Sequence, residues 1–162
     1  MSEQQNQFTI RRATLADAEA VASMVGDLLS EIMAAIGIPA FDVAFEETAE
    51  RLLNFLETGR YVVFVAIDGY GETVGFIALH ESSALYAGGV FGVIPELYVL
   101  PECRSFGVGR GLLDAAVQFG KSRGWTRLEV TTPPLPEFDR TLAFYEQEGF
   151  EVTGGRKLRV LL

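Results

Sequence analysis

The 162-residue sequence contains one cysteine, Cys103, and one histidine, His80. A single cysteine excludes a disulfide within the chain and agrees with a reducing compartment, so we expect a cytoplasmic protein. One cysteine and one histidine are too few for a typical structural zinc site, and we expect no bound metal.

Long hydrophobic runs are also absent. No stretch approaches the roughly 20 apolar residues of a membrane span, and the polar start, Met1–Gln7, has no secretory character. The 13 basic residues are outnumbered by 22 acidic residues, which gives a net charge of −9. Nucleic-acid binding needs a basic surface, so we expect neither a nucleic acid nor a membrane as partner. An acidic protein is compatible with a cationic amine as ligand.

The composition is that of an ordinary globular protein, with 49% hydrophobic and 22% charged residues. The length predicts one domain, residues 1–162, with a substantial core. Hydrophobic spacing and turn residues predict an α+β domain around one twisted sheet. The expected elements are a strand at 8–11, helices at 18–32 and 45–56, a hairpin of strands at 61–67 and 73–80, a strand at 91–99, a helix after Gly107, a strand at 127–131, a helix at 137–148 and two short final strands.

The most informative stretch is 97–113, in which a β-branched and aromatic run ends at Pro101. The turn Arg-x-x-Gly-x-Gly follows at Arg104, Gly107 and Gly109, and a helical pattern opens directly from it. Glycines let the backbone approach a ligand, and the first N–H groups of a helix have no partner within it. Such a turn can bind a phosphate or pyrophosphate, or it can be only a tight connection. Leu112 replaces the third glycine of a dinucleotide fingerprint, and no Walker A loop is present.

This stretch resembles the acetyl-CoA signature of the GNAT acyltransferase superfamily, Val-x-Pro-x-x-Arg-x-x-Gly-x-Gly. Further stretches are similar to that family's opening strand and helix, to a later strand and to its Phe-Tyr-x-x-x-Gly-Phe helix end. They are residues 10–18, 125–130 and 144–150. The resemblance implies the GNAT fold, a single twisted mixed sheet of six to seven strands with about four flanking helices and a splayed central strand pair. Many relatives are dimers, and the final strand, 157–162, could pair across such an interface.

The resemblance also implies acetyl-CoA as cosubstrate, with its pantetheine arm added beside the 91–99 strand. The expected cofactor-binding residues are Leu97, Tyr98, Val99, Arg104, Ser105, Phe106, Gly107, Val108, Gly109 and Arg110. The family's helix often carries an Asn and an Ala where this chain has Phe138 and Thr141. The missing Asn removes a common cofactor contact and leaves the seating of pantetheine open.

Two residues are candidates for catalysis of acyl transfer. Pro95 and Glu96 are awkward within a central strand, and GNAT domains place a bulge there. Glu96 is the candidate base for an acceptor amine, or else a sheet glutamate that pairs with an arginine or faces solvent. The resemblance gives Tyr145 the role of proton donor to the departing thiolate, and a buried aromatic is the alternative. Either Tyr98 or Val99 could supply a backbone N–H to the thioester carbonyl.

We therefore expect an N-acetyltransferase that acts on a primary amine of a small molecule or protein by direct attack in a ternary complex. No histidine lies near Cys103 in the sequence, which favours this route over an acyl-enzyme. The alternatives are a non-catalytic acyl-CoA sensor and a transferase of longer acyl chains. The acceptor should be shaped by the connection at 37–45 and the loop at 82–91.

Overall fold

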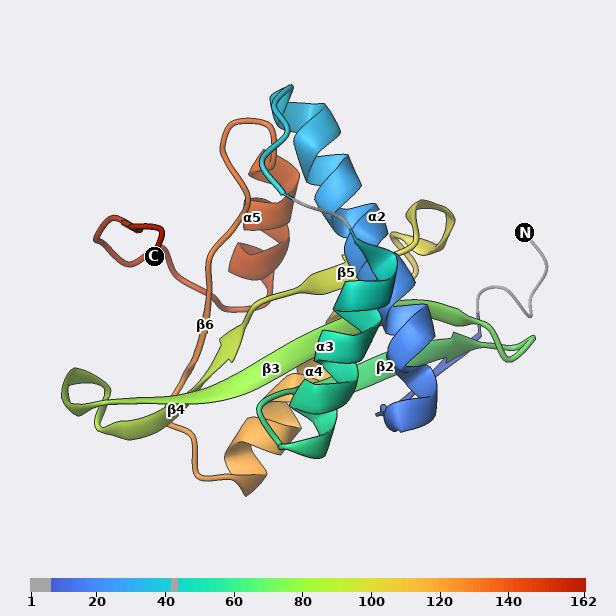
Figure 1. Ribbon diagram of the computed structural model, residues 1–162. Helices are drawn as coiled ribbons and strands as arrows, with labels where there is room; N and C mark the ends of the chain where they lie inside the picture. Colours follow the sequence, from blue (N-terminus) through green and yellow to red (C-terminus); the bar gives the residue numbers. More distant parts are fainter. Residues whose placement is uncertain (1–6, 42–43) are drawn as a thin grey trace. The chain divides into compact units, whose positions relative to one another are not determined.

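The computed structural model describes residues 7–41 and 44–162, and Figure 1 shows the elements along the chain. The chain forms two compact units, Met1–Thr131 and Thr132–Leu162. Of the described residues, the first unit holds six strands and three α-helices, and the second holds one α-helix. This mixed α+β architecture confirms the expected fold class.

The sheet of the first unit is mostly antiparallel and has the order β1-β2-β3-β4-β6, with β5 also paired to β3. Among the strands of the described residues, only β4 and β6 run parallel to each other. The strands are β1 (Phe8–Arg12), β2 (Val62–Asp68), β3 (Thr73–Ala84), β4 (Gly89–Ile94), β5 (Leu97–Val99) and β6 (Leu128–Val130). The predicted hairpin between β2 and β3 is confirmed. Its turn is held by Asp68, whose Oδ1 accepts the N–H groups of Tyr70 and Glu72, each at 2.9 Å.

Helices cover both faces of this sheet. Helices α2 (Ala18–Ile36) and α3 (Phe45–Glu57) lie in front of β2 and β3 in Figure 1, and α4 (Val108–Ser122) lies behind them. Successive residues of a strand face opposite sides, so Phe76 packs into the core under α2, whereas Gly75 faces Val108 and Leu112 of α4. The core on the α2 side is formed by Ala18, Val21, Met24, Leu52, Val63, Val65, Phe76, Ala78 and Tyr98.

The helix boundaries follow the predicted signals. A capping box of Thr14 and Asp17 opens the short 3-10 turn Leu15–Asp17 that leads into α2. Asp17 is buried and accepts two hydrogen bonds from the Arg11 guanidinium, each at 2.8 Å. Gly37 ends α2 in the left-handed conformation, with φ of 73°.

The end of the chain differs from the prediction. In the second unit, α5 spans Asp139–Gln147, and residues 151–162 contain neither helix nor strand. The two predicted final strands are therefore wrong. Alternation of apolar residues predicts a strand only where one face becomes buried, and here Leu158 and Leu161 remain 90% and 82% exposed. The predicted pairing across a dimer interface needs a strand at residues 157–162, and these residues do not form one.

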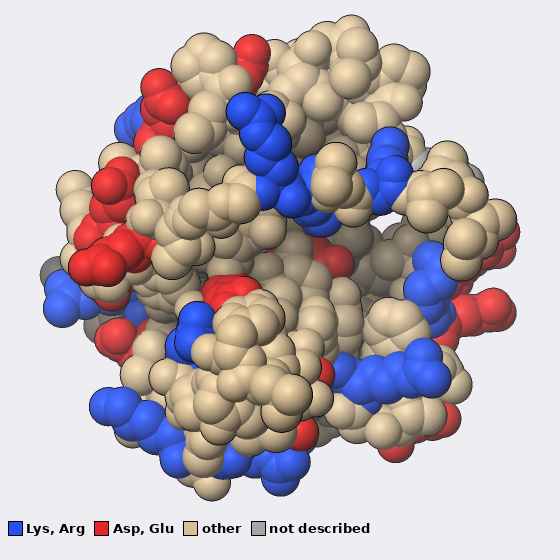
Figure 2. Space-filling model, turned by 90° about the vertical axis from the view of Figure 1, so that its left-hand side faces the viewer, with Lys and Arg blue, Asp and Glu red and all other residues tan. Residues whose placement is uncertain are grey.

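Charged side chains of both signs are interleaved on the face that Figure 2 draws, which is therefore not a continuous basic surface. Among the helices of residues 7–41 and 44–162, none has the length and apolar character that a membrane span needs.

Candidate active site

A break between β4 and β5 creates the unusual geometry at the centre of the sheet. Both strands pair with β3, His80 opposite Val93 in β4 and Ile77 opposite Leu97 in β5. Glu96 lies opposite Ala78, whose N–H donates to the Glu96 carbonyl at 2.9 Å. Two residues, Ile94 and Pro95, therefore stand against Leu79 alone, which is a β-bulge. The bulge confirms the expectation from the sequence, and it explains how a proline is tolerated here.

The sheet opens beside this bulge. Strand β6 pairs with β4 as far as Val130, which lies opposite Ile94. Strand β5 continues past the bulge, and within the described residues its only strand partner is β3. The predicted splayed central pair is thus confirmed, and β5 has an open edge on the side away from β3.

Along β5, the N–H and C=O groups of successive residues point alternately toward β3 and toward the open edge. The Leu100 N–H donates to the Val74 carbonyl, and Ala78 pairs with Glu96, so Tyr98 occupies the hydrogen-bonded position opposite Phe76. The N–H groups of Leu97 and Val99 consequently point away from β3. Of the two N–H groups considered for the thioester carbonyl, the alternation favours Val99 over Tyr98.

The turn that is predicted to bind a phosphate follows β5 after the short 3-10 turn Pro101–Cys103. Ser105 and Gly107 both adopt positive φ, 70° and 86°, and Gly107 is the N-cap of α4. The first bond within the helix is donated by Gly111 to the Gly107 carbonyl at 2.9 Å, so the N–H groups of Val108 and Gly109 have no acceptor inside the helix. Ser105, Phe106 and Arg110 are exposed, Gly109 is partly exposed, and Val108 is buried with its side chain in the core. Val108 can therefore contact a ligand only through its backbone.

Arg104 has a different environment from the one that the motif suggests. Its Nη1 and Nη2 donate to the two carboxylate oxygens of Glu31 on α2 at 2.9 and 2.8 Å. Its Nε donates to the Val99 carbonyl at 2.8 Å, and its guanidinium lies 5.3 Å from the centre of the Tyr98 ring. This ion pair holds the pKa of Glu31 below its ordinary value. In this arrangement the Arg104 side chain joins β5 to α2.

Glu96 is half-buried at the bulge and bonded to a tyrosine. The Tyr61 hydroxyl donates to the Glu96 carboxylate, 3.0 Å from Oε2 and 3.2 Å from Oε1. Burial raises the pKa of Glu96 above its ordinary value, and the hydrogen bond from Tyr61 opposes this increase. Glu96 is therefore neither paired with an arginine nor simply solvated, and its pKa moves toward the range that suits a general base near neutral pH.

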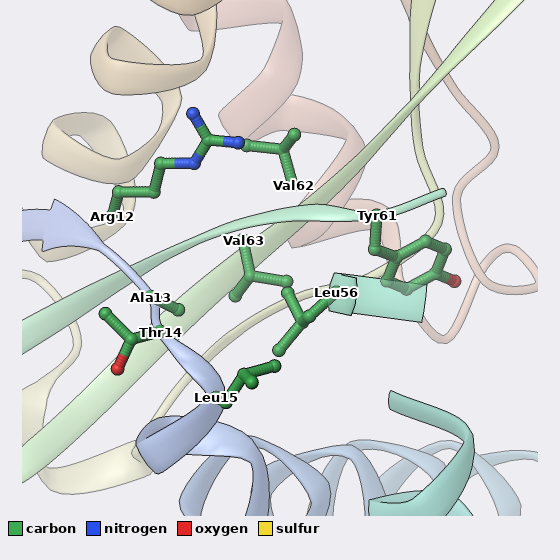
Figure 3. A pocket seen from close by; sticks show the side chains of 8 residues that line it. All are labelled: Arg12, Ala13, Thr14, Leu15, Leu56, Tyr61, Val62 and Val63. Carbon is green, nitrogen blue, oxygen red and sulfur yellow. The ribbon is translucent and has the colours of Figure 1, made fainter. Parts of the chain in front are cut away.

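A cavity of about 240 Å³ adjoins this tyrosine. Figure 3 shows Tyr61 at one side of the cavity, with its hydroxyl directed away from the other lining side chains. The cavity is lined by Arg12, Ala13, Thr14, Leu15, Leu56, Tyr61, Val62 and Val63.

Tyr145 and Cys103 are the two other residues considered for the chemistry. Tyr145 belongs to the second unit, where its buried ring contacts Phe144 and Phe150 with centroids 5.3 and 5.2 Å apart. Burial raises the pKa of Tyr145, so its hydroxyl stays protonated and can donate a hydrogen bond. Burial also raises the pKa of Cys103, which disfavours the thiolate that an acyl-enzyme would need. No cluster of potential metal ligands occurs among the described residues.

Sequence reasoning missed two partners in this site, Tyr61 and Glu31. The sequence predicts Tyr61 only as part of a strand of the hairpin, and it is 35 residues from Glu96 in the chain. Glu31 is 73 residues from Arg104. A tyrosine at a strand start and a glutamate on a helix carry no local signal of these contacts. Asp42, in the connection expected near the acceptor, lies outside the described residues.

Comparison with known proteins agrees with this geometry. The model of the acetyltransferase (GNAT) domain matches residues 59–152. The aminoglycoside N(6′)-acetyltransferase type 1 of Stenotrophomonas maltophilia is 35% identical over 152 residues, which cover 90% of this chain and 87% of that protein. An uncharacterized N-acetyltransferase of Bacillus subtilis is 28% identical over 149 residues, covering 91% of this chain and 93% of that protein.

Among solved structures, a "predicted acetyltransferase" of Clostridium acetobutylicum with acetyl-CoA matches with a TM-score of 0.76 at 21% identity. The match covers 94% of this chain and 96% of that one. The domain match spans more than half of the chain, and the relatives cover nearly all of it. This chain therefore belongs to the GNAT family of acetyltransferases and is an enzyme of that class.

Proposed function

We propose that this protein transfers an acetyl group from acetyl-CoA to a primary amine by direct attack in a ternary complex. The observation that carries the proposal is the open edge of β5, which starts beside Glu96 and leads into the turn at the start of α4. An extended pantetheine arm can add to such an edge through backbone hydrogen bonds. The helix N-terminus at its end suits the pyrophosphate. The Clostridium acetobutylicum structure, which contains acetyl-CoA, supports this choice of donor.

In this reaction, the nitrogen lone pair of the amine attacks the thioester carbonyl. The amine proton passes to the Glu96 carboxylate, directly or through water, and the C–S bond breaks to release the thiolate. The Val99 N–H is the proposed donor to the carbonyl oxygen as negative charge develops there. We propose Glu96 as general base because its pKa is raised and its carboxylate is fixed by Tyr61. Tyr145 as the donor to the thiolate stays a prediction.

The acceptor class that we propose is a polycationic amine of the aminoglycoside type. The 35% identical relative is named for that activity. The net charge of −9 favours attraction of a cation. Arg104 offsets the charge of Glu31 on α2, but Asp27, one turn earlier on the same helix, also acts electrostatically on Tyr98 of β5. Negative charge is thus present close to the strand that would hold the thioester.

The first experiment is isothermal titration with acetyl-CoA, CoA and ATP, followed by turnover with kanamycin and detection of free CoA thiol. We expect micromolar binding of both CoA forms, no binding of ATP, and thiol release only when the amine is present. An absence of CoA binding would refute the proposal. Faster turnover with propionyl- or succinyl-CoA would replace the acetyl assignment.

Two variants test whether Glu96 and Tyr145 take part in catalysis. In Glu96→Gln, we expect CoA binding to stay unchanged while kcat/KM falls roughly 100-fold or more, as for loss of a general base. Tyr145→Phe should lower kcat with CoA binding intact. Full turnover by both variants would remove these residues from the mechanism. The single domain 1–162, the homodimer and the cytoplasmic location stay predictions, and gel filtration tests the dimer.

A further inference from the structure

The ring of Tyr61 is held on two sides, by side chains of the first unit. Phe55 on α3 lies against it with ring centroids 5.0 Å apart, and His80 on β3 stacks nearly parallel to it at 6.4 Å and 13°. The Tyr61 backbone is fixed as well, because its N–H donates to the Phe55 carbonyl at 3.1 Å. Such a clamped aromatic ring gives its hydroxyl one direction.

That direction leads to Glu96. The hydroxyl lies within hydrogen-bond distance of both carboxylate oxygens, at 3.0 and 3.2 Å, so it fixes the position of the carboxylate group. Burial raises the pKa of Tyr61 well above that of a free phenol, and the negative charge of Glu96 raises it further. Tyr61 therefore stays protonated and acts as a donor; it is not itself a base.

We propose that Tyr61 is a positioning residue for the general base, and that its hydroxyl sets the pH at which Glu96 becomes active. The inference rests on the proposed function, in which Glu96 accepts the amine proton. Two opposing effects act on the carboxylate: partial burial disfavours its charged form, and the hydrogen bond from Tyr61 favours it. Without the bond, burial would keep Glu96 protonated to a higher pH, and a smaller share of the enzyme would hold a usable base at neutral pH.

The test replaces Tyr61 by Phe, which keeps the ring between Phe55 and His80 and removes only the hydroxyl. The Glu96 carboxyl is titrated directly by ¹³C NMR in glutamate-labelled protein, with its signal assigned from its loss in Glu96→Gln. One hydrogen bond to a charged group corresponds to roughly one to two pKa units. We expect the Glu96 midpoint to rise by about one unit in Tyr61→Phe. His80 stacks on Tyr61, and a carboxyl signal reports on Glu96 without a contribution from the imidazole.

Tyr70→Phe is the matched control, because it removes a hydroxyl from an exposed tyrosine in the turn between β2 and β3. It should leave the Glu96 midpoint unchanged. A second variant guards against a general loss of structure. Replacing Tyr61 by 3,5-difluorotyrosine makes the phenol a stronger donor, so the Glu96 midpoint should fall. Shifts of opposite sign in the two Tyr61 variants cannot come from loosened packing, whereas an unchanged midpoint in both would overturn the inference.

Kinetics with kanamycin connect the titration to catalysis. The acidic limb of kcat/KM should move up by the same amount as the NMR midpoint in Tyr61→Phe, with little change in the KM for acetyl-CoA. If Glu96→Gln keeps both full activity and the acidic limb, then Glu96 is not the base, and the proposed mechanism fails with the inference. If Glu96→Gln loses activity while Tyr61→Phe shifts neither the midpoint nor the limb, only the inference fails.

Discussion

A single methyl group at Gly107 tests whether the turn before α4 is a ligand-binding cradle or only a tight connection. Gly107 is the N-cap of α4 and has φ of +86°, a conformation that residues with a Cβ rarely adopt. A Cβ added there would meet no other atom within 4 Å. The change Gly107→Ala therefore introduces backbone strain without a steric clash inside the protein.

The same helix provides the matched control at its other end. Gly124 follows α4 with φ of +74°, and a Cβ there also has nothing within 4 Å. Left-handed backbone costs a residue with a side chain about 1–2 kcal/mol. Both variants should thus lose about 1 kcal/mol of stability, which lowers Tm by roughly 2–4 °C in a chain of this size.

Only Gly107→Ala should also weaken the binding of CoA. Its methyl group would stand where the backbone must approach the phosphates, and a lost hydrogen bond to a charged group is worth about 1.5–3 kcal/mol. We expect Kd for acetyl-CoA to rise roughly 10- to 100-fold in Gly107→Ala and to stay constant in Gly124→Ala. Thermal melts and isothermal titration measure the two quantities separately.

Equal CoA affinity in wild type and both variants would refute the cradle and leave the turn as a structural connection. Equal weakening in both variants would show that affinity only follows stability. Either result would remove the main support for acetyl-CoA binding at this helix terminus.

Three further changes test other parts of the structure. The raised pKa of Glu96 means that the folded protein loses stability as pH rises from the unfolded pKa of about 4.3 through the folded value. In urea unfolding, Glu96→Gln should therefore be more stable than wild type above the folded pKa of Glu96, but not below about pH 4. The same pH dependence of stability in both proteins would contradict the raised pKa of Glu96. Asp17 has a lowered pKa because Arg11 and Thr14 donate to its carboxylate, so its contribution is present above pH 4 and is lost as pH falls through the folded value. Asp17→Asn should lower the free energy of unfolding by about 1.5 kcal/mol at pH 7, near the low end for a hydrogen bond to a charged group because Arg11 is half exposed. An unchanged free energy of unfolding in urea would contradict a stabilising role of this cap. A Cβ at Gly92 would overlap the Trp125 ring and Leu128, so Gly92→Ala should lose about 1–3 kcal/mol, and an unchanged melting curve would show that the ring can move aside.

Much of the fold could be predicted because its signals are local. The glycines at the ends of α2 and α3, the Thr14–Asp17 cap and the Asp68 turn each involve residues within a few positions of one another. The bulge was also predictable, since Pro95 lacks a donor for a central strand. The final strands were predicted wrongly because alternation at 157–162 does not say whether a face will become buried.

The sequence by itself determined the order of strands and helices, the turn that opens α4 and the family resemblance, because these depend on the spacing of glycines, prolines and apolar residues along the chain. Only the tertiary structure decided what the key side chains contact. The Arg104 guanidinium binds Glu31 on α2, and the Tyr61 hydroxyl donates to the Glu96 carboxylate. Both contacts join residues far apart in the sequence, so they form only when the sheet and its helices pack together. The pKa of Glu96 depends on its burial and on its hydrogen bond with Tyr61, and neither can be predicted from the residues next to it in the sequence.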